Sequence, residues 1–179
     1  MQMKKVLMIA ALAAALFSPR SAAQSGKLPF ENDYAFGLDL SFVKSAEDRG
    51  RKLYDTDGKE KNAWEIFRSH GYNWGRLMIC SEPSRLGQTL DYVKRGALEL
   101  KKYGYHFILD FMMADGWSNP MTQPTPKSLE NMSHTERVKA FHDFVYNAVK
   151  ELSDAGTAPE IVQVGNEISN GVFWPTGRV

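Results

Sequence analysis

The chain has 179 residues, of which 43% are hydrophobic and 24% are charged, a balance typical of an ordinary globular domain with its own core. Its formal net charge is +1, so it lacks the long-range field that proteins use to attract nucleic acid or an anionic membrane. We therefore expect neither of these as its partner.

The first 23 residues have the pattern of a secretory signal peptide. Two lysines precede an apolar run from Val6 to Phe17. This run is too short to span a hydrocarbon core of roughly 30 Å, which needs about 20 helical residues. Small residues at 21–23 fit a cleavage site, so we expect cleavage before Gln24. The mature domain would be residues 24–179, secreted or periplasmic and without a membrane span; a retained anchor is the alternative.

The cysteine and histidine content gives no sign of a disulfide or a metal site. Cys80 is the only cysteine, so no internal disulfide can form. Its place at the end of an apolar strand indicates a small buried hydrophobe rather than a reactive thiol. The four histidines are scattered, and no His and Cys cluster has metal-ligand spacing. We expect no metal and no other cofactor.

Four short apolar strands are expected along the mature chain. They cover residues 36–41, 73–79, 105–111 and 160–165. Between them the sequence has the three- and four-residue periodicity of amphipathic helices.

Turn and cap signals separate these elements. One helix ends at Gly71 and another at Gly104, and Ser133 with Glu136 forms a capping box that begins a third. Asp57-Gly58 marks a turn. A long polar loop rich in proline runs from residue 112 to about residue 131.

The alternation of strands and helices predicts an α/β fold. Strands that are apolar on both faces favour parallel βαβ units. Either an open doubly wound sheet or part of a (β/α)₈ TIM barrel satisfies this pattern. No glycine-rich phosphate turn follows the first strand, which weakens the case for a nucleotide-binding open sheet. Polar residues gather after the strand ends, where both folds carry chemistry, and we favour the barrel.

Asn166 and Glu167 follow the last expected strand. A glutamate at a barrel rim can act as a general acid if a partly apolar site raises its pKa. A neighbouring asparagine amide can both donate to and accept from a sugar hydroxyl. Taken alone, this pair is more simply explained by Glu167 as a helix cap or a solvated side chain.

Other polar and aromatic residues lie at similar positions. Arg76 interrupts an apolar strand, where a guanidinium is costly unless it is paired. It would orient and keep ionised a carboxylate nucleophile, or else form a salt bridge at the rim. Acids at strand ends and indoles in the following loops are candidates for sugar binding, with ordinary loop packing as the alternative for the indoles. These candidates are Asp39, Asp110, Asp115, Trp117 and Trp174.

With these residues in place, the chain resembles family 53 of the glycoside hydrolases, the endo-β-1,4-galactanases. The resemblance runs from about Phe36 to Pro175 and rests on several segments. They are GLDLSF, YDTDGKEKNAWEIFRSHG, the Arg-Leu of RLMIC, LDYV, LDF with Asp115 and Trp117 behind it, and PEIVQVGNEISNGVFWP. The resemblance implies a secreted retaining enzyme on a (β/α)₈ barrel that cuts β-1,4-galactosidic bonds inside arabinogalactan or pectic galactan.

The resemblance also implies a role for individual residues. Glu167 corresponds to the acid/base at the end of the fourth strand, Asn166 binds the 2-hydroxyl, and Arg76 neighbours the nucleophile. The nucleophile is a second glutamate at the end of strand seven, and this chain covers only about the first four βα units. Retaining hydrolysis needs two carboxyl groups about 5–5.5 Å apart, so we expect the chain as given to be inactive alone.

Five positions depart from the family pattern. Met112 to Ala114 stand where the family usually has His-Tyr-Ser, Cys80 replaces a tryptophan, and Met78 replaces a second arginine. These changes indicate a divergent specificity or a decaying site. A non-catalytic carbohydrate-binding remnant that uses its loop tryptophans, or an unrelated open α/β domain, are the alternatives.

Overall fold

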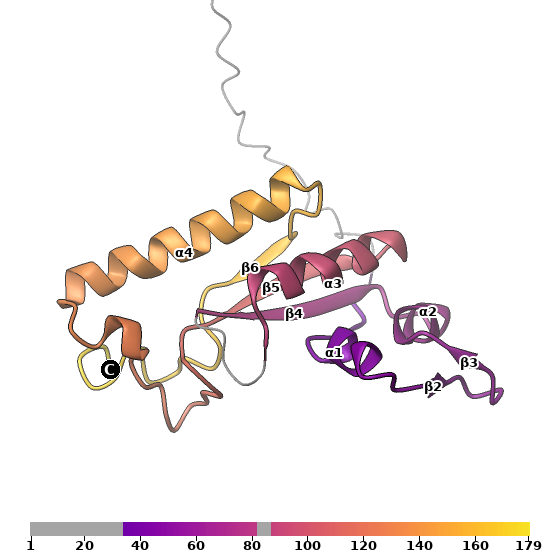
Figure 1. Cartoon of the computed structure of the whole chain (residues 1–179), viewed down its shortest axis with the longest axis horizontal. Helices are drawn as coiled ribbons and strands as arrows, with labels where there is room; N and C mark the ends of the chain where they lie inside the picture. The colour runs from indigo at the N-terminus through magenta and orange to yellow at the C-terminus, as the bar shows by residue number, and fades with distance from the viewer. Residues whose placement is uncertain (1–33, 82–86) are drawn as a thin grey trace, which may run out of the picture. The chain divides into compact units, whose positions relative to one another are not determined.

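The computed structural model describes residues 34–81 and 87–179 (Figure 1). Tyr34–Val179 group by their contacts into one unit. The expected signal peptide and its cleavage site therefore lie outside the described residues. In the part of the chain that is described, no helix has the length and apolar character needed to cross a membrane.

Four parallel strands form the central sheet, in the order in which they occur along the chain. Each strand pairs with the next, as the barrel interpretation requires, and the order does not reverse midway as it does in a doubly wound sheet. The four expected strands are confirmed, although the two outer ones are only three residues long. The strands are β1 (Gly37–Asp39), β4 (Trp74–Cys80), β5 (His106–Met112) and β6 (Ile161–Gln163).

The three expected helices are also confirmed, and each begins at a side-chain cap. The Asn62 side chain accepts from Glu65 N, and the Thr89 side chain accepts from Tyr92 N. The last helix begins with the predicted capping box at Ser133. These helices are α2 (Ala63–Ser69), α3 (Leu90–Lys102) and α4 (His134–Asp154).

Short elements were not expected from the sequence. The helix α1 (Val43–Asp48) follows β1, and the antiparallel strands β2 (Leu53–Tyr54) and β3 (Glu60–Lys61) flank the predicted turn at Asp57-Gly58. The long loop after β5 contains one turn of 3₁₀ helix, Lys127–Leu129. These elements lack both a clear hydrophobic period and a long apolar run, so the sequence gives no pattern from which to predict them.

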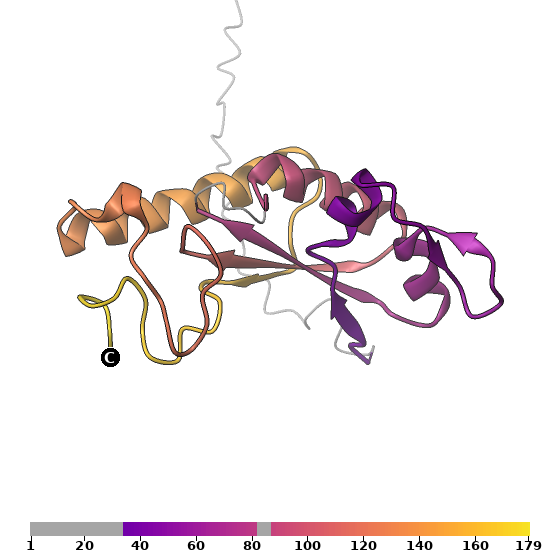
Figure 2. The same ribbon diagram turned by 60° about the horizontal axis from the view of Figure 1, so that its bottom comes forward.

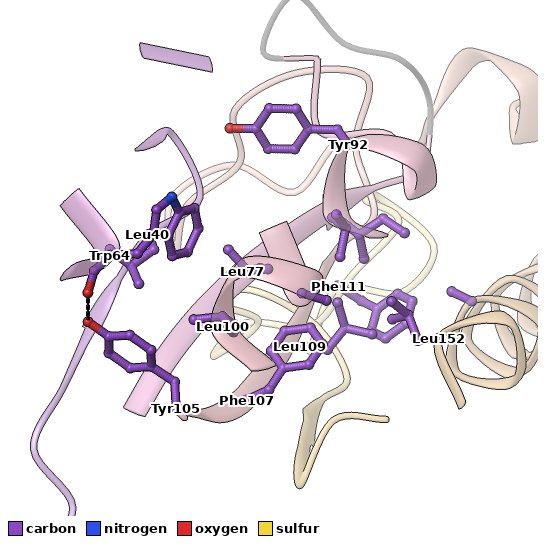
Figure 3. Packing of buried hydrophobic residues seen from close by; sticks show 14 residues of the cluster. Leu40, Trp64, Leu77, Tyr92, Leu100, Tyr105, Phe107, Leu109, Phe111 and Leu152 are labelled. Carbon is purple, nitrogen blue, oxygen red and sulfur yellow. Dashed lines mark hydrogen bonds between the residues drawn. The ribbon is translucent and has the colours of Figure 1, made fainter. Parts of the chain in front are cut away.

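The main core lies between the sheet and its helices. Figure 2 shows α3 and α4 on one face of the sheet. Leu77 of β4 and Leu109 and Phe111 of β5 point to this face and pack against Leu100 of α3 and Leu152 of α4 (Figure 3). Because side chains alternate along a strand, Arg76 and Asp110 must point to the opposite, inner face. The fold thereby directs these polar groups away from the core and toward the interior of the partial barrel.

Candidate functional site

An arginine and its partners gather on the inner face of the sheet. We call this set the arginine cluster: Asp39, Arg76, Asp110, Gln163 and Asn166. Asp39 is the last residue of β1 and lies directly beside Arg76 in the register of the sheet. Asp110 of β5 lies beside Gln163 of β6, and Asn166 follows β6 by three residues. Each of the four strands thus contributes to one small region.

The Arg76 guanidinium holds the cluster together. Its Nη1 forms an ion pair with the Asp39 carboxylate, and its Nη2 lies 2.7 Å from Asp110 Oδ2. Nη2 also donates to Asn166 Oδ1 at 3.0 Å, and Nε donates to Gln163 Oε1 at 3.4 Å. The cost of placing a guanidinium in an apolar strand is therefore offset by two carboxylates and two amide oxygens. Of the two interpretations, this contact set fits a positioned arginine better than an isolated rim salt bridge.

Asp110 is the most perturbed acid of the cluster. It is fully buried, and although its ion pair with Arg76 is close, neither of its oxygens accepts a well-formed hydrogen bond from the described residues. Burial raises the pKa of Asp110 to about 6; Arg76 opposes this shift, while the negative charges of Asp39 and Glu167 add to it. Near pH 6 this carboxyl group is therefore divided between its neutral and ionised forms.

Asn166 and Glu167 are held through their backbone. Asn166 is buried, and its N–H donates to the carbonyl of Phe111 at 3.0 Å. The Gln123 side chain donates to the carbonyl oxygens of Asn166 at 2.9 Å and Glu167 at 3.2 Å. Glu167 itself has a φ of 54°, a left-handed conformation that is uncommon for residues other than glycine and that clusters at functional sites. Its side chain is exposed, so a ligand in the open interior could reach it.

Gln123 and Gln163 were not among the residues singled out from the sequence. Gln163 lies within the QVGNE stretch and alternates with the apolar residues of its strand. This alternation could have been used to predict that its side chain points to the inner face of the sheet. Gln123 is buried in the proline-rich loop, and nothing in the local pattern marks it. It donates to backbone carbonyls 43 and 44 residues away in the sequence. Contacts between such distant residues produce no periodic pattern in the sequence.

Three other predicted residues do not join the arginine cluster. Asp115 accepts from Lys127 N at 2.9 Å, so it fixes the start of the 3₁₀ turn. Trp174 donates from Nε1 to Asn170 O, and the Arg178 guanidinium lies 4.5 Å from its ring centroid. Trp117 is 56% exposed. Their assignment to sugar binding stays a prediction.

Apolar residues next to Asp110 include those interpreted from the sequence as departures from the family pattern. Met78, Cys80, Met112 and Ala114 make one buried cluster. Met113 points elsewhere and packs with Leu129 and Phe173. Cys80 is buried, as expected for a small apolar side chain. Apolar side chains therefore line one side of Asp110, in agreement with burial as the main cause that raises its pKa.

Acidic and histidine side chains do not assemble into a metal site in the described ranges, where no group of three or more His, Cys, Asp or Glu could hold an ion. The arginine cluster is cationic at its centre and its acids are engaged by Arg76. Its chemistry is that of hydrogen bonding, charge stabilisation and proton transfer.

Comparison with known proteins supports the same interpretation. The model of Glycosyl hydrolase family 53 matches residues 35–179. The chain belongs to this family. Among solved structures, the Ignisphaera aggregans GH53 catalytic domain superposes with a TM-score of 0.77 at 32% identity, covering 82% of this chain and 43% of that one. A structure titled as one of two fungal β-1,4-galactanases gives 0.76 at 28% identity, covering 81% and 43%. The predicted family and the partial (β/α)₈ barrel are thus confirmed.

Several curated proteins with similar sequences carry galactanase names. The probable arabinogalactan endo-β-1,4-galactanase A of Neosartorya fischeri is 32% identical over 146 residues, which cover 79% of this chain and 40% of that protein. The arabinogalactan endo-β-1,4-galactanase of Thermothelomyces thermophilus is 32% identical over 146 residues, covering 79% and 42%. The chain spans about two fifths of the length of these relatives.

Proposed function

We propose that this chain supplies the acid/base part of a retaining glycoside hydrolase that cuts β-1,4-galactosidic bonds within arabinogalactan or pectic galactan. Membership of family 53 supports the enzyme class, and relatives named as arabinogalactan endo-β-1,4-galactanases support the substrate class. One observation carries the proposal: Arg76 Nη2 donates to Asn166 Oδ1, which brings the arginine of β4 beside the Asn-Glu pair that follows β6.

In this proposal Glu167 is the proton donor. It protonates the glycosidic oxygen as the bond breaks and then takes a proton from the water that releases the sugar. Asn166 would present its amide to a sugar hydroxyl, and Arg76 would hold a carboxylate nucleophile in its ionised form. That nucleophile is expected from a later strand of the barrel than these four. Asp39 and Asp110 fix the direction of Arg76, and Trp117 and Trp174 are proposed as rim contacts to the polysaccharide.

The proposal includes export from the cytoplasm. The pattern in residues 1–23 supports a signal peptide, and a polysaccharide substrate would be met outside the cell membrane. Cleavage before Gln24 would leave the barrel segment 24–179. Sequencing the amino terminus of the exported protein tests this part, and an intact Met1 on that protein would contradict it.

The catalytic proposal can be tested in a chimera that supplies the remaining strands. Residues 34–179 would replace the matching segment of the Ignisphaera aggregans GH53 catalytic domain. We expect this chimera to release reducing sugar from β-1,4-galactan, whereas the 179-residue chain alone does not. Glu167→Gln should lower the rate at least about 100-fold, because general acid–base catalysis contributes that much or more.

A matched control separates catalysis from surface charge. Glu151 of α4 pairs with Lys94 on the surface, so Glu151→Gln removes the same charge at an exposed site and should leave the rate unchanged. A folded chimera whose galactan hydrolysis is unaffected by Glu167→Gln would exclude Glu167 as the acid/base. A folded chimera without activity on galactan would overturn the proposed substrate.

A further inference from the structure

The loop between β5 and α4 lies against the segment that follows β6 (Figures 1 and 2). Pro124 and Trp174 form a parallel bridge between these two segments, and Trp174 N donates to Gln123 O at 2.8 Å. Asn170 Nδ2 also donates to Pro120 O at 2.9 Å. Two segments that are far apart in the sequence are therefore fastened together beside the carboxyl ends of the strands.

The Gln123 side chain reaches from this junction to the Asn-Glu turn, residues 165–167. It is buried, and its Nε2 donates to the carbonyl oxygens of Asn166 at 2.9 Å and Glu167 at 3.2 Å. A third contact, to Asn119 O at 3.2 Å, ties the amide to its own loop. The two carbonyls in the turn belong to the peptide groups on either side of the Glu167 Cα. One buried amide therefore holds both peptide planes that flank the proposed acid/base.

Holding two successive peptide planes fixes the backbone between them. Peptide groups are planar, so φ and ψ are the only soft backbone angles of a residue, and they set the direction of its Cα–Cβ bond. Glu167 has a φ of 54°, in the left-handed region that residues other than glycine adopt only when their surroundings hold them there. The contacts of Gln123 supply such a hold. The direction in which the Glu167 side chain leaves the backbone thus depends on a residue of another loop.

We propose that Gln123 is a positioning residue for Glu167, and that its amide keeps the Glu167 carboxyl group directed at the glycosidic oxygen. This inference rests on the proposed function, because it explains how the acid/base of that same site is oriented. Gln123 acts through the backbone of Glu167 and needs no contact with the sugar. A general acid must come within about 2.6–3.2 Å of the atom that it protonates. A misplacement of about 1 Å can cost roughly 100-fold in rate.

The alternative is that Gln123 only fastens the two loops. Asn170 already provides a link of that kind, because its contact with Pro120 joins the same segments without touching the Asn-Glu turn. Fastening two loops does not require one amide to bind both carbonyls around a single residue. The arrangement of the Gln123 contacts therefore favours control of the turn, and Asn170 offers a matched control for the experiment.

Two substrates that differ in their need for an acid separate these roles in the chimera described above. The sugar that leaves from galactan must be protonated, whereas the dinitrophenolate of a dinitrophenyl β-galactobioside leaves without a proton. Gln123→Met keeps the length of the side chain but removes the donor. We expect this variant to lower kcat/KM on galactan at least about tenfold. On the aryl galactobioside we expect a loss of no more than about twofold, because the acid is not needed there.

Two other variants frame this comparison. Glu167→Gln removes the acid itself and should show the same preference for the aryl galactobioside. Asn170→Ala removes only the link between the loops and should leave kcat/KM on both substrates unchanged. Gln123→Met that lowers kcat/KM equally on the two substrates would overturn the proposal, because a loss of fold or of loop packing affects both reactions alike.

Nuclear magnetic resonance on the protein of all 179 residues gives a second measurement that needs no substrate. The backbone chemical shifts of Glu167 report its φ and ψ, and they should move in Gln123→Met but not in Asn170→Ala. Glu167 shifts that stay in place in Gln123→Met would overturn the proposal. A chimera that hydrolyses neither substrate would contradict the proposed function instead, and Glu167 shifts that move in Gln123→Met would even then support the hold of Gln123 on the turn.

Discussion

Replacing Asp110 by asparagine should make the protein more stable at neutral pH. Asp110 is fully buried, and burial raises its pKa to about 6 even though Arg76 opposes the shift. The ionised form of Asp110 is therefore less favourable in the folded protein than in the unfolded chain. Asn keeps the shape of the side chain but cannot ionise, so the variant removes this cost.

The size and sign of the effect follow from the pKa. The unfolded value is 3.8 and the folded value is about 6, so the folded state binds the proton more tightly. The stability linked to Asp110 is fully present below about pH 4 and is lost as pH rises through about 6. A shift of roughly two units corresponds to about 3 kcal/mol at full ionisation. This figure already includes the attraction between Arg76 and the ionised Asp110. In the variant, Arg76 keeps Asp39 as its partner.

Urea unfolding at pH 4 and at pH 8 measures the effect. We compare the free energy of unfolding of Asp110→Asn with that of the parent at each pH. The difference should favour the variant by about 3 kcal/mol more at pH 8 than at pH 4. Asp154→Asn, on the exposed end of α4, is the control and should show almost no pH-dependent difference. An Asp110→Asn variant that is less stable at pH 8 than at pH 4, relative to the parent, would refute the argument, because it would mean that the ionised pair with Arg76 stabilises the fold.

Three further changes test particular contacts. Gln123→Ala removes the donor to the carbonyls of Asn166 and Glu167, and chemical unfolding should show a loss of about 1–3 kcal/mol; an unchanged stability would mean that water replaces the amide. Gly37→Ala would place a Cβ 2.7 Å from Trp74 Cβ and should cost about 1–3 kcal/mol, whereas Gly116→Ala, with nothing within 4 Å, should cost little; equal effects would contradict the packing argument. Trp117→Ala should weaken binding to galactan, measured as retention in an affinity gel, by about 0.5–1.5 kcal/mol without lowering the melting temperature. Unchanged retention would remove Trp117 from the sugar-binding surface.

The longer elements of the fold could be predicted because packing against one core imposes a repeating pattern. In β5, Leu109 and Phe111 lie on the helix side and Met112 is buried on the opposite face, a pattern that predicts a buried parallel strand. The capping box at Ser133 fixes the start of α4 through two local hydrogen bonds. By contrast, α1 and the β2–β3 hairpin are too short for periodicity to show.

The arginine cluster could be predicted only in part. Arg76 and Asp110 stand out because a charge in an apolar strand needs a partner, and strand alternation places both on the inner face. Their mutual contact depends on the register between β4 and β5, in which Asp110 lies beside Met78 and not beside Arg76. The length of the guanidinium side chain bridges that offset. The role of Gln123 could not be predicted, since its contacts depend on how a long loop folds back over the strand ends.

The energetics of the arginine cluster point to function more than to stability. A buried ion pair costs desolvation on both sides, and replacing one with well-packed apolar residues is often neutral or stabilising. The inner face of the sheet already accepts apolar side chains, because Met78 and Met112 pack there beside Asp110. The fold therefore has no need of a charged centre at this position to close its core. Arg76 contacts residues of β1 and β5, of β6 and of the Asn-Glu turn that follows it, and Glu167 in that turn has a left-handed backbone. This arrangement agrees with the proposed enzyme, in which a charge must be fixed in one direction before the substrate binds.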